Sequence, residues 1–318
     1  MKLGIATAVL AALLTPVPVA AAVIETGAFH DAGRGRDVPY KAYWPNGQKG
    51  PRPVVIFSHG LGGTRSAAAY LGSALSSAGF IAIHIQHAGS DAVVYRGSQN
   101  RREVSDALRA SVRVPANGHN RFLDLPFVLD ALTMRNMDGP WANKLDLGRV
   151  GMAGHSYGAR SVLVAAGQRI GKKYISFREP RIRAGIAIST SSPSGNLEMG
   201  RVFGDISIPL LHITGSRDRG AYSWRSHITP ASRLEPYRAI NAPIQYLLVL
   251  ENADHFVFSG RRLGTRREKP LDKAHIASVA RIATAFFKAH LMDDNQALVW
   301  LRNEYSKTLA AGDRFTFR

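Results

Sequence analysis

The chain has 318 residues, no cysteine and a formal net charge of +18 at pH 7. This length suits one large α/β domain or two small ones. The lack of cysteine excludes disulfide bonds, a thiolate nucleophile and any metal site with cysteine ligands. The basic residues are spread along the chain without stacking aromatics between them, which favours a solvated arginine-rich surface over a nucleic-acid-binding face.

The N-terminus has the pattern of an export signal. It begins with a basic residue, continues with an uncharged apolar stretch over residues 4–14, and ends in the small residues Ala20-Ala21-Ala22. Two prolines after the apolar stretch disfavour a stable membrane span. We therefore expect a cleaved signal peptide over residues 1–22 and a single domain over residues 23–318, located in the periplasm or secreted.

The first elements of this domain predict an antiparallel edge and then a strand–helix–strand unit. Tyr40–Trp44 is the first expected strand, and the turn signal Pro45-Asn46-Gly47 predicts a hairpin at one edge of the sheet. Val54–Phe57 is continuously apolar, which is typical of a strand buried on both faces of a parallel sheet. A helix over residues 66–78 and a strand over residues 80–85 complete the unit.

A long polar segment interrupts the regular elements. Residues 86–120 are poorly periodic, so we expect a loop insertion that covers the catalytic end of the sheet. Asn120 is the expected N-cap of the amphipathic helix that follows. Arg121 and Asp124 lie three residues apart in that helix and are expected to pair on its surface.

The rest of the chain alternates between strand and helix signals. Strands are expected over residues 184–188, 209–214 and 244–250, a long helix over residues 273–291, and a shorter helical tail over residues 296–309. This order predicts an α/β fold with a mostly parallel central sheet flanked by helices. Ligands and catalytic groups in such sheets gather at the carboxyl ends of the strands.

A glycine-flanked serine provides the strongest motif. Gly154-His155-Ser156-Tyr157-Gly158 has the form G-x-S-x-G, and it follows a short apolar strand and precedes a small-residue helix. The motif places the serine on a tight turn with its hydroxyl exposed, and the glycines allow other backbone segments to approach closely. The positive end of the helix also favours negative charge that develops there. Ser156 is therefore the expected nucleophile.

A serine hydroxyl is a weak nucleophile and needs a base, which in turn needs an orienting acid. In the fold that uses this turn, the chain order is serine, acid, histidine. Asp218 and His255 each follow a predicted late strand, and they are the expected acid and base. Asp205 and Asp254 are the rival acids, but neither follows a strand by a short loop while leaving His255 free.

The oxygen anion of a tetrahedral intermediate needs nearby N–H donors. The backbone N–H of Tyr157, directly after the serine, and that of Leu61, in the loop after an early strand, are the expected pair. His59 and His155 lie in the same turns and are expected to orient the backbone.

Other histidines and glycines suggest alternatives that the pattern disfavours. His84 and His87 with Asp91 have a metal-like spacing, but no third strong ligand accompanies them, so we expect structural roles and no metal. His212 is expected to be a core histidine within a strand. The glycines at residues 60–63 do not complete a dinucleotide fingerprint, so no cofactor is expected.

Taken together, these motifs resemble the α/β-hydrolase superfamily. Within it, the chain is similar to bacterial serine esterases related to platelet-activating-factor acetylhydrolase, often labelled dienelactone-hydrolase-like. The resemblance covers residues 35–295 and rests on Phe57-Ser58-His59-Gly60-Leu61-Gly62-Gly63, on the G-x-S-x-G turn, on Asp218 and on Asp254-His255-Phe256. Dienelactone hydrolases use a cysteine nucleophile, which this chain lacks, so lactone specificity does not carry over.

The resemblance implies a catalytic triad of Ser156, Asp218 and His255, with the N–H groups of Leu61 and Tyr157 as the oxyanion hole. It also implies hydrolysis of small-molecule or lipid esters with a short or modified acyl group. We therefore predict an exported carboxylic ester hydrolase that works through an acyl-enzyme. An amidase or peptidase on the same triad is one alternative. A non-catalytic protein with this fold that binds an anionic envelope surface is the other.

Overall fold

The structure is a computed structural model that describes residues 22–47, 49–193 and 195–318. The predicted signal peptide lies outside the described residues, except for Ala22. None of the described helices combines the length and the apolar character that crossing a membrane requires.

Within the described residues, the strands form one nine-stranded sheet in the order β1-β2-β4-β3-β5-β6-β7-β8-β9. The strands are β1 (Val23–Asp31), β2 (Arg36–Trp44), β3 (Arg52–Ser58), β4 (Ile81–Ile85), β5 (Leu145–His155), β6 (Ile182–Ile188), β7 (Leu210–Arg217), β8 (Gln245–Asp254) and β9 (Arg314–Phe317). Neighbouring strands from β4 to β8 pair in parallel, whereas β1, β2 and β9 add antiparallel pairs at the two edges. The prediction of a mostly parallel sheet is confirmed.

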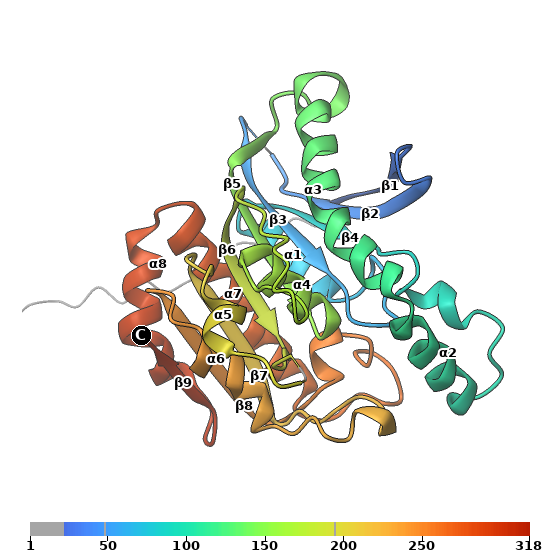
Figure 1. Cartoon of the computed structure of the whole chain (residues 1–318). Helices are drawn as coiled ribbons and strands as arrows, with labels where there is room; N and C mark the ends of the chain where they lie inside the picture. The colour runs from blue at the N-terminus through green and yellow to red at the C-terminus, as the bar shows by residue number, and fades with distance from the viewer. Residues whose placement is uncertain (1–21, 48, 194) are drawn as a thin grey trace, which may run out of the picture.

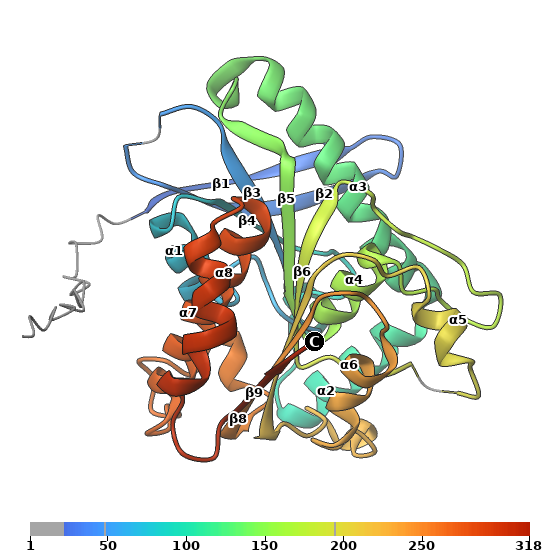
Figure 2. The same ribbon diagram turned by 90° about the vertical axis from the view of Figure 1, so that its left-hand side faces the viewer.

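Helices cover both faces of the sheet, as Figures 1 and 2 show. They are α1 (Ala69–Ser77), α2 (Arg101–Arg113), α3 (Pro115–Met137), α4 (Tyr157–Ala166), α5 (Met199–Phe203), α6 (Glu235–Ala239), α7 (Asp272–Leu291) and α8 (Asn295–Val299). One apolar core lies between the sheet and helices α3 and α4, and another lies between the sheet and helices α1 and α7. Successive residues of β3 enter opposite cores, which explains its continuous apolar run.

The antiparallel edge differs from the prediction. The hairpin joins β1 to β2, and its turn lies at residues 32–35 rather than at Pro45-Asn46-Gly47. The latter turn leads to β3, which is not a neighbour of β2 because β4 lies between them. Most residues of β1 are exposed or half-buried, so no apolar pattern marked this strand in the sequence.

The expected loop insertion over residues 86–120 is largely helical. It contains a short turn of 3₁₀ helix, helix α2 and the start of α3. The segment is mostly polar, which favoured a loop, but its few apolar residues, Val104, Ala107 and Leu108, have helical spacing and lie on the side that is buried. Its N-cap is Asn100, whose side chain accepts hydrogen bonds from the following backbone N–H groups. Asn120 is not a cap, because α3 already begins at Pro115.

The insertion packs against the loop that follows β3. The Tyr95 hydroxyl donates to the Gly62 carbonyl at 3.1 Å, and the Gly62 N–H donates to the Ser90 carbonyl at 2.9 Å. The Ala92 N–H donates to the Gly63 carbonyl at 3.0 Å. The insertion therefore holds the loop that carries Leu61, at the carboxyl edge of β3.

Candidate active site

Ser156 lies on a strained turn between β5 and α4. Its backbone has φ +57° and ψ −112°, in a region that residues with a side chain rarely adopt. The Ser156 N–H donates to the Ile188 carbonyl at the end of β6 at 2.8 Å, which holds the turn against the neighbouring strand. The backbone thus has the strand–turn–helix form that the G-x-S-x-G motif predicts.

The motif glycines leave no room for side chains. A Cβ on Gly158 would collide with the Ser58 carbonyl oxygen, and a Cβ on Gly154 would collide with the Gly158 carbonyl. Both obstacles are backbone atoms, which cannot move aside cheaply. The glycines therefore allow β5, α4 and the end of β3 to pack closely enough to form the site.

We expect Gly158→Ala to destabilise the fold by about 3 kcal/mol, because the added methyl group meets backbone atoms. The free energy of unfolding in urea measures this loss. Gly200→Ala is the control: Gly200 lies in α5 with nothing within 4 Å of an added Cβ. That variant should be neutral or more stable by up to about 1 kcal/mol. Equal stability of the Gly158→Ala protein and the wild type would contradict the packing.

Ser156, His255 and Asp218 come together at the carboxyl edge of the sheet. His255 Nε2 lies 2.9 Å from Ser156 Oγ, and His255 Nδ1 lies 2.8 Å from Asp218 Oδ1. When Nδ1 carries the ring proton and donates to Asp218, Nε2 is free to accept the serine proton. This is the order of hydrogen bonds that general-base activation of a serine requires.

The environment of Asp218 keeps its carboxylate ionised. Burial by itself raises the pKa of Asp218, but the hydrogen bond and charge of His255 and the charge of Arg233 lower it to about 2. The Thr214 hydroxyl also donates to Oδ2 at 2.8 Å. The acid is therefore a fully buried anion that is held in place by hydrogen bonds.

Arg233 is a contact of this acid that the sequence analysis missed. One of its terminal nitrogens lies 3.1 Å from Asp218 Oδ1, and another donates to the Ser189 carbonyl at 2.6 Å. The first nitrogen also lies 2.9 Å from His255 Nδ1, but an arginine can only donate, so this is no hydrogen bond while Nδ1 is protonated. The sequence pattern favours a solvated surface for the basic residues in general, but the structure buries Arg233.

The rival acids bind other partners. Asp205 pairs with Arg169 at 2.7 Å. Asp254 pairs with Arg262 at 2.8 Å and with Lys269 at 2.5 Å. Neither carboxylate is bonded to His255 in the described part of the chain, whereas Asp218 is.

The ionised Asp218 should make stability depend on acidic pH. The pKa of Asp218 is about 2 in the folded state, below its ordinary value of 3.8, so the ionised carboxylate stabilises the fold fully above pH 3.8. That contribution is lost as the pH falls through about 2. We expect the stability of wild type relative to Asp218→Asn to be constant at neutral pH and to fall between about pH 4 and pH 2. Urea unfolding at each pH tests this, and a difference independent of pH would contradict it.

Leu61 and Tyr157 present backbone N–H groups beside the serine. Both residues line a small cleft of about 20 Å³, together with Ser156 and His255. In the described part of the chain, neither N–H donates to another group. A Cβ on Gly60 would lie 3.3 Å from the Ser156 Cβ, so the loop carrying Leu61 lies directly on the serine turn. Two donors are thus available for an oxygen anion in the cleft.

His59 and His155 bond to the backbone around this cleft. His59 Nδ1 donates to the Gly60 carbonyl at 2.7 Å, and its Nε2 accepts from the His87 N–H at 3.1 Å. His155 Nε2 donates to the His255 carbonyl at 2.9 Å. Burial lowers the pKa of His59 well below its usual value and that of His155 to about 3, so both rings are neutral at neutral pH.

The histidines at positions 84 and 212 have hydrogen-bond partners within the core. His84 Nδ1 donates to the Ala67 carbonyl at 3.0 Å, and His212 Nε2 lies 2.9 Å from Gln245 Oε1. Among the residues that the structure describes, no group of three or more His, Cys, Asp or Glu side chains could hold a metal ion.

A comparison with protein-family models adds to this geometry. The model described as platelet-activating factor acetylhydrolase, isoform II, matches residues 37–117, which include β3 and the loop carrying Leu61. The chain has an α/β-hydrolase fold and, over residues 37–117, is similar to the platelet-activating-factor acetylhydrolases. The family implies ester hydrolysis as the general class of activity. A search of curated proteins found no match.

A buried network in this hydrolase replaces the surface pair that we predicted for Arg121 and Asp124. Both side chains are buried beneath α3. Asp124 binds Arg34 at 3.0 Å, Arg36 at 3.1 Å and His87 Nδ1 at 2.9 Å. The prediction was wrong because the spacing within the helix does not show which of its faces packs against the sheet.

Arg121 links the two segments that carry the free N–H groups. It donates to Ser58 Oγ at 2.9 Å, next to the loop of Leu61, and to Ser161 Oγ in α4 at 3.0 Å. Its guanidinium carbon also lies 4.6 Å from the ring centroid of Tyr157. Burial lowers the pKa of Arg121 to about 10, so the side chain stays charged at neutral pH.

We expect Arg121→Ala to destabilise the hydrolase by about 3 kcal/mol and to slow ester hydrolysis more than tenfold, since buried acceptors lose their donor. Urea unfolding and kcat measure the two effects. Arg181→Ala is the control: Arg181 pairs with Asp130 and Glu179 but is partly exposed. It should lose about 1 kcal/mol or less without loss of kcat. An Arg121→Ala enzyme with normal kcat would contradict the linking role.

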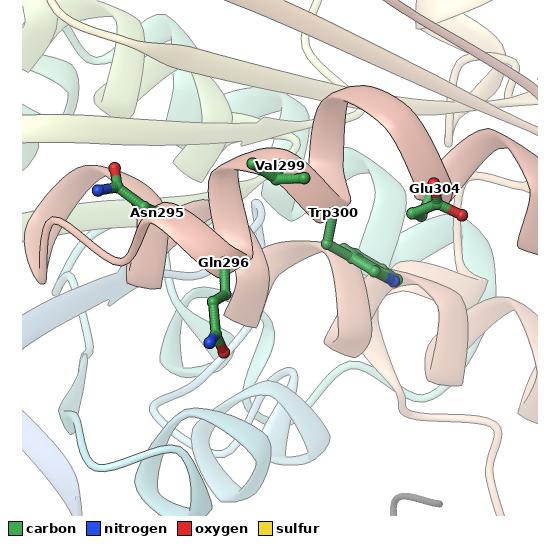
Figure 3. A pocket seen from close by; sticks show the side chains of 5 residues that line it. All are labelled: Asn295, Gln296, Val299, Trp300 and Glu304. Carbon is green, nitrogen blue, oxygen red and sulfur yellow. The ribbon is translucent and has the colours of Figure 1, made fainter. Parts of the chain in front are cut away.

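Two hollows on the protein differ in the reactive side chains that line them. A cavity of about 550 Å³ opens beside Ser156 and is also lined by Tyr157 and Arg160. Another hollow, of about 420 Å³, lies on α8 and the helical turn after it, and Figure 3 shows the side chains that line it. It is lined by Asn295, Gln296, Val299, Trp300 and Glu304. This second hollow holds no pairing of a nucleophile with a base, so we place the reaction in the cavity beside Ser156.

Proposed function

We propose that this hydrolase is a serine esterase that cleaves carboxylic esters through an acyl-enzyme. The observation that carries the proposal is the distance of 2.9 Å between Ser156 Oγ and His255 Nε2, in a ring whose other nitrogen bonds to Asp218. The N–H groups of Leu61 and Tyr157 in the same cleft support it.

The proposed mechanism uses each group once in acylation and again in deacylation. Ser156 Oγ attacks the ester carbonyl carbon while His255 Nε2 takes the serine proton. Leu61 and Tyr157 donate hydrogen bonds to the carbonyl oxygen as it becomes an anion. Protonated His255 then gives its proton to the leaving alcohol. Water, activated by the same histidine, attacks the acyl carbon and releases the acid and Ser156, while Asp218 stabilises the charged imidazole.

A short acyl group is the form of substrate that the cleft favours. The space around Ser156, Leu61 and His255 is only about 20 Å³, whereas the neighbouring cavity measures about 550 Å³. We propose that a short acyl chain occupies the small cleft and that the larger part of the ester extends into the cavity.

A series of p-nitrophenyl esters from acetate to palmitate tests this proposal. We expect the highest kcat/KM for the shortest acyl chains, and covalent labelling of Ser156 by a fluorophosphonate. The matching p-nitroanilides test the amidase alternative and should react far more slowly than the esters. Best activity on palmitate would contradict the short-acyl proposal, and labelling elsewhere than Ser156 would contradict the assigned nucleophile.

We also propose export, which residues 1–22 support through their basic, apolar and small-residue pattern. Expression of the full chain in a bacterium with two membranes, followed by fractionation and N-terminal sequencing, tests it. The mature protein should lie in the periplasm or medium and begin near Ala21 or Val23. A full-length chain confined to the cytoplasm would contradict export.

A further inference from the structure

The cavity beside Ser156 carries two arginines that no carboxylate among the described residues neutralises. Arg160 and Arg225 both line this cavity of about 550 Å³. In the described part of the chain, neither guanidinium group forms an ion pair or a hydrogen bond, although the cation of Arg225 lies 4.8 Å from the ring centroid of Trp224. Stacking on an aromatic ring leaves the N–H groups of a guanidinium free to bind a ligand.

Arg225 is the more constrained of the two. Its Nε is buried without a hydrogen-bond partner. Burial and then the positive charge of Arg160 lower the pKa of Arg225, with Arg233 adding to the repulsion. A partly buried cation that faces other cations is unfavourable until a counter-charge arrives. An anionic ligand would supply that charge.

The two arginines line the cavity and also lie next to Ser156. Arg225 also lines the small cleft that contains Ser156 and His255. Arg160 lies one helical turn beyond the serine, and its N–H donates to the Ser156 carbonyl at 3.2 Å. A group bound between the two guanidinium groups would therefore lie close to the ester that Ser156 attacks.

Other charges at the cavity do not cancel this pair. Arg233 lines it too, but Arg233 is already paired with Asp218 at 3.1 Å. Glu235 is the acidic residue of the lining; it is exposed and forms no ion pair with Arg160 or Arg225 in the described structure. The cavity thus presents two available cations and one solvated carboxylate.

We propose that Arg160 and Arg225 form an anion-binding subsite, and that the preferred substrate is an ester carrying a carboxylate or phosphate group. This inference rests on the proposed esterase function. A guanidinium group can donate two parallel hydrogen bonds to either anion, so the shared chemistry is an anionic oxygen group. The anionic group can belong to the acyl side or the alcohol side of the ester, and the test has an arm for each.

Matched pairs of esters measure the contribution of the negative charge. On the acyl side, mono-p-nitrophenyl adipate is compared with p-nitrophenyl hexanoate, which has the same number of acyl carbons. On the alcohol side, 4-acetoxybenzoate and 4-acetoxyphenyl phosphate are compared with 4-acetoxybenzamide. We expect at least one anionic ester to exceed its neutral partner about tenfold or more in kcat/KM at about 0.15 M salt, where long-range attraction is screened.

Arginine variants show whether the preference depends on these two residues. The ratio of anionic to neutral kcat/KM should fall about tenfold or more in Arg225→Gln and in Arg160→Gln. The ratio cancels any loss common to both substrates. Arg266→Gln is the control, because Arg266 is exposed in a loop outside the cavity and its change should leave the ratio as in wild type.

The outcomes separate this inference from the proposed function. If Ser156-dependent hydrolysis occurs but every ratio is near one, or if both variants keep the wild-type ratio, the subsite is wrong and the esterase proposal stands. If no ester is cleaved through Ser156, the proposed function is wrong, and calorimetry with adipate, benzoate and inorganic phosphate then decides the subsite. Binding that Arg225→Gln removes would support it, and no binding of any of the three would overturn it.

Discussion

Replacing Ser156 with alanine should lower kcat for p-nitrophenyl acetate by about 10⁴- to 10⁶-fold. The substitution removes the atom that would form the proposed acyl-enzyme but leaves His255, Asp218 and the two N–H donors in place. Activity above the uncatalysed rate would come only from these remaining groups. The measurement compares wild type and variant, purified in the same way, with a fluorophosphonate label to count active sites.

Folding of this variant provides its control. The Ser156 hydroxyl contacts His255 but fills no part of either apolar core, so the urea midpoint should change little. A stable Ser156→Ala protein that kept more than about a tenth of the wild-type kcat would overturn the assignment of the nucleophile. It would do so without any ambiguity about the fold.

Asp218→Asn should lower kcat by about 10⁴-fold, the second of the two largest effects. The asparagine amide would donate to His255 Nδ1, where the carboxylate now accepts at 2.8 Å. The ring proton would then move to Nε2, and the histidine could no longer accept the proton of Ser156. Steady-state kinetics from neutral to alkaline pH should show that higher pH does not restore the rate, since the loss comes from the wrong tautomer.

Asp254→Asn is the matched control, because Asp254 was a rival acid and is the last residue of β8, directly before His255. Its carboxylate is bound to Arg262 and Lys269 rather than to His255. We expect kcat within a few-fold of wild type, and a loss of about 1 kcal/mol of stability from the partly exposed ion pairs. The reverse pattern, with activity lost in Asp254→Asn and kept in Asp218→Asn, would make Asp254 the acid.

Local chain order was enough to predict most of the sheet and the form of the serine turn. A buried parallel strand needs a continuous apolar run, and β3 has one. A tight strand-to-helix turn needs residues without side chains beside it, and Gly154 and Gly158 meet that need. Because parallel strands end at one edge, the positions of Asp218 and His255 in the sequence also predicted that they would lie near the serine.

Elements with a weak pattern could not be predicted in this way. Strand β1 is mostly exposed and has no clear apolar period, and α2 has helical spacing but too few apolar residues to stand out in a polar segment. Their places depend on what packs against them, such as the contact of Tyr95 with Gly62 across the insertion. The order of the strands likewise depends on pairing, which inserts β4 between β2 and β3.

The sequence by itself therefore determined the chemistry that this chain can attempt: a serine on a tight turn, followed by an acid and a base at the ends of later strands. Only the tertiary structure decided which arginines are buried and which groups they bind. Arg121 and Arg233 are buried beside Ser58 and Ser189. These partners are distant in sequence, so only folding brings them to the arginines. Burying a charge is unfavourable unless such partners converge, and among the described residues the buried Nε of Arg225 has none.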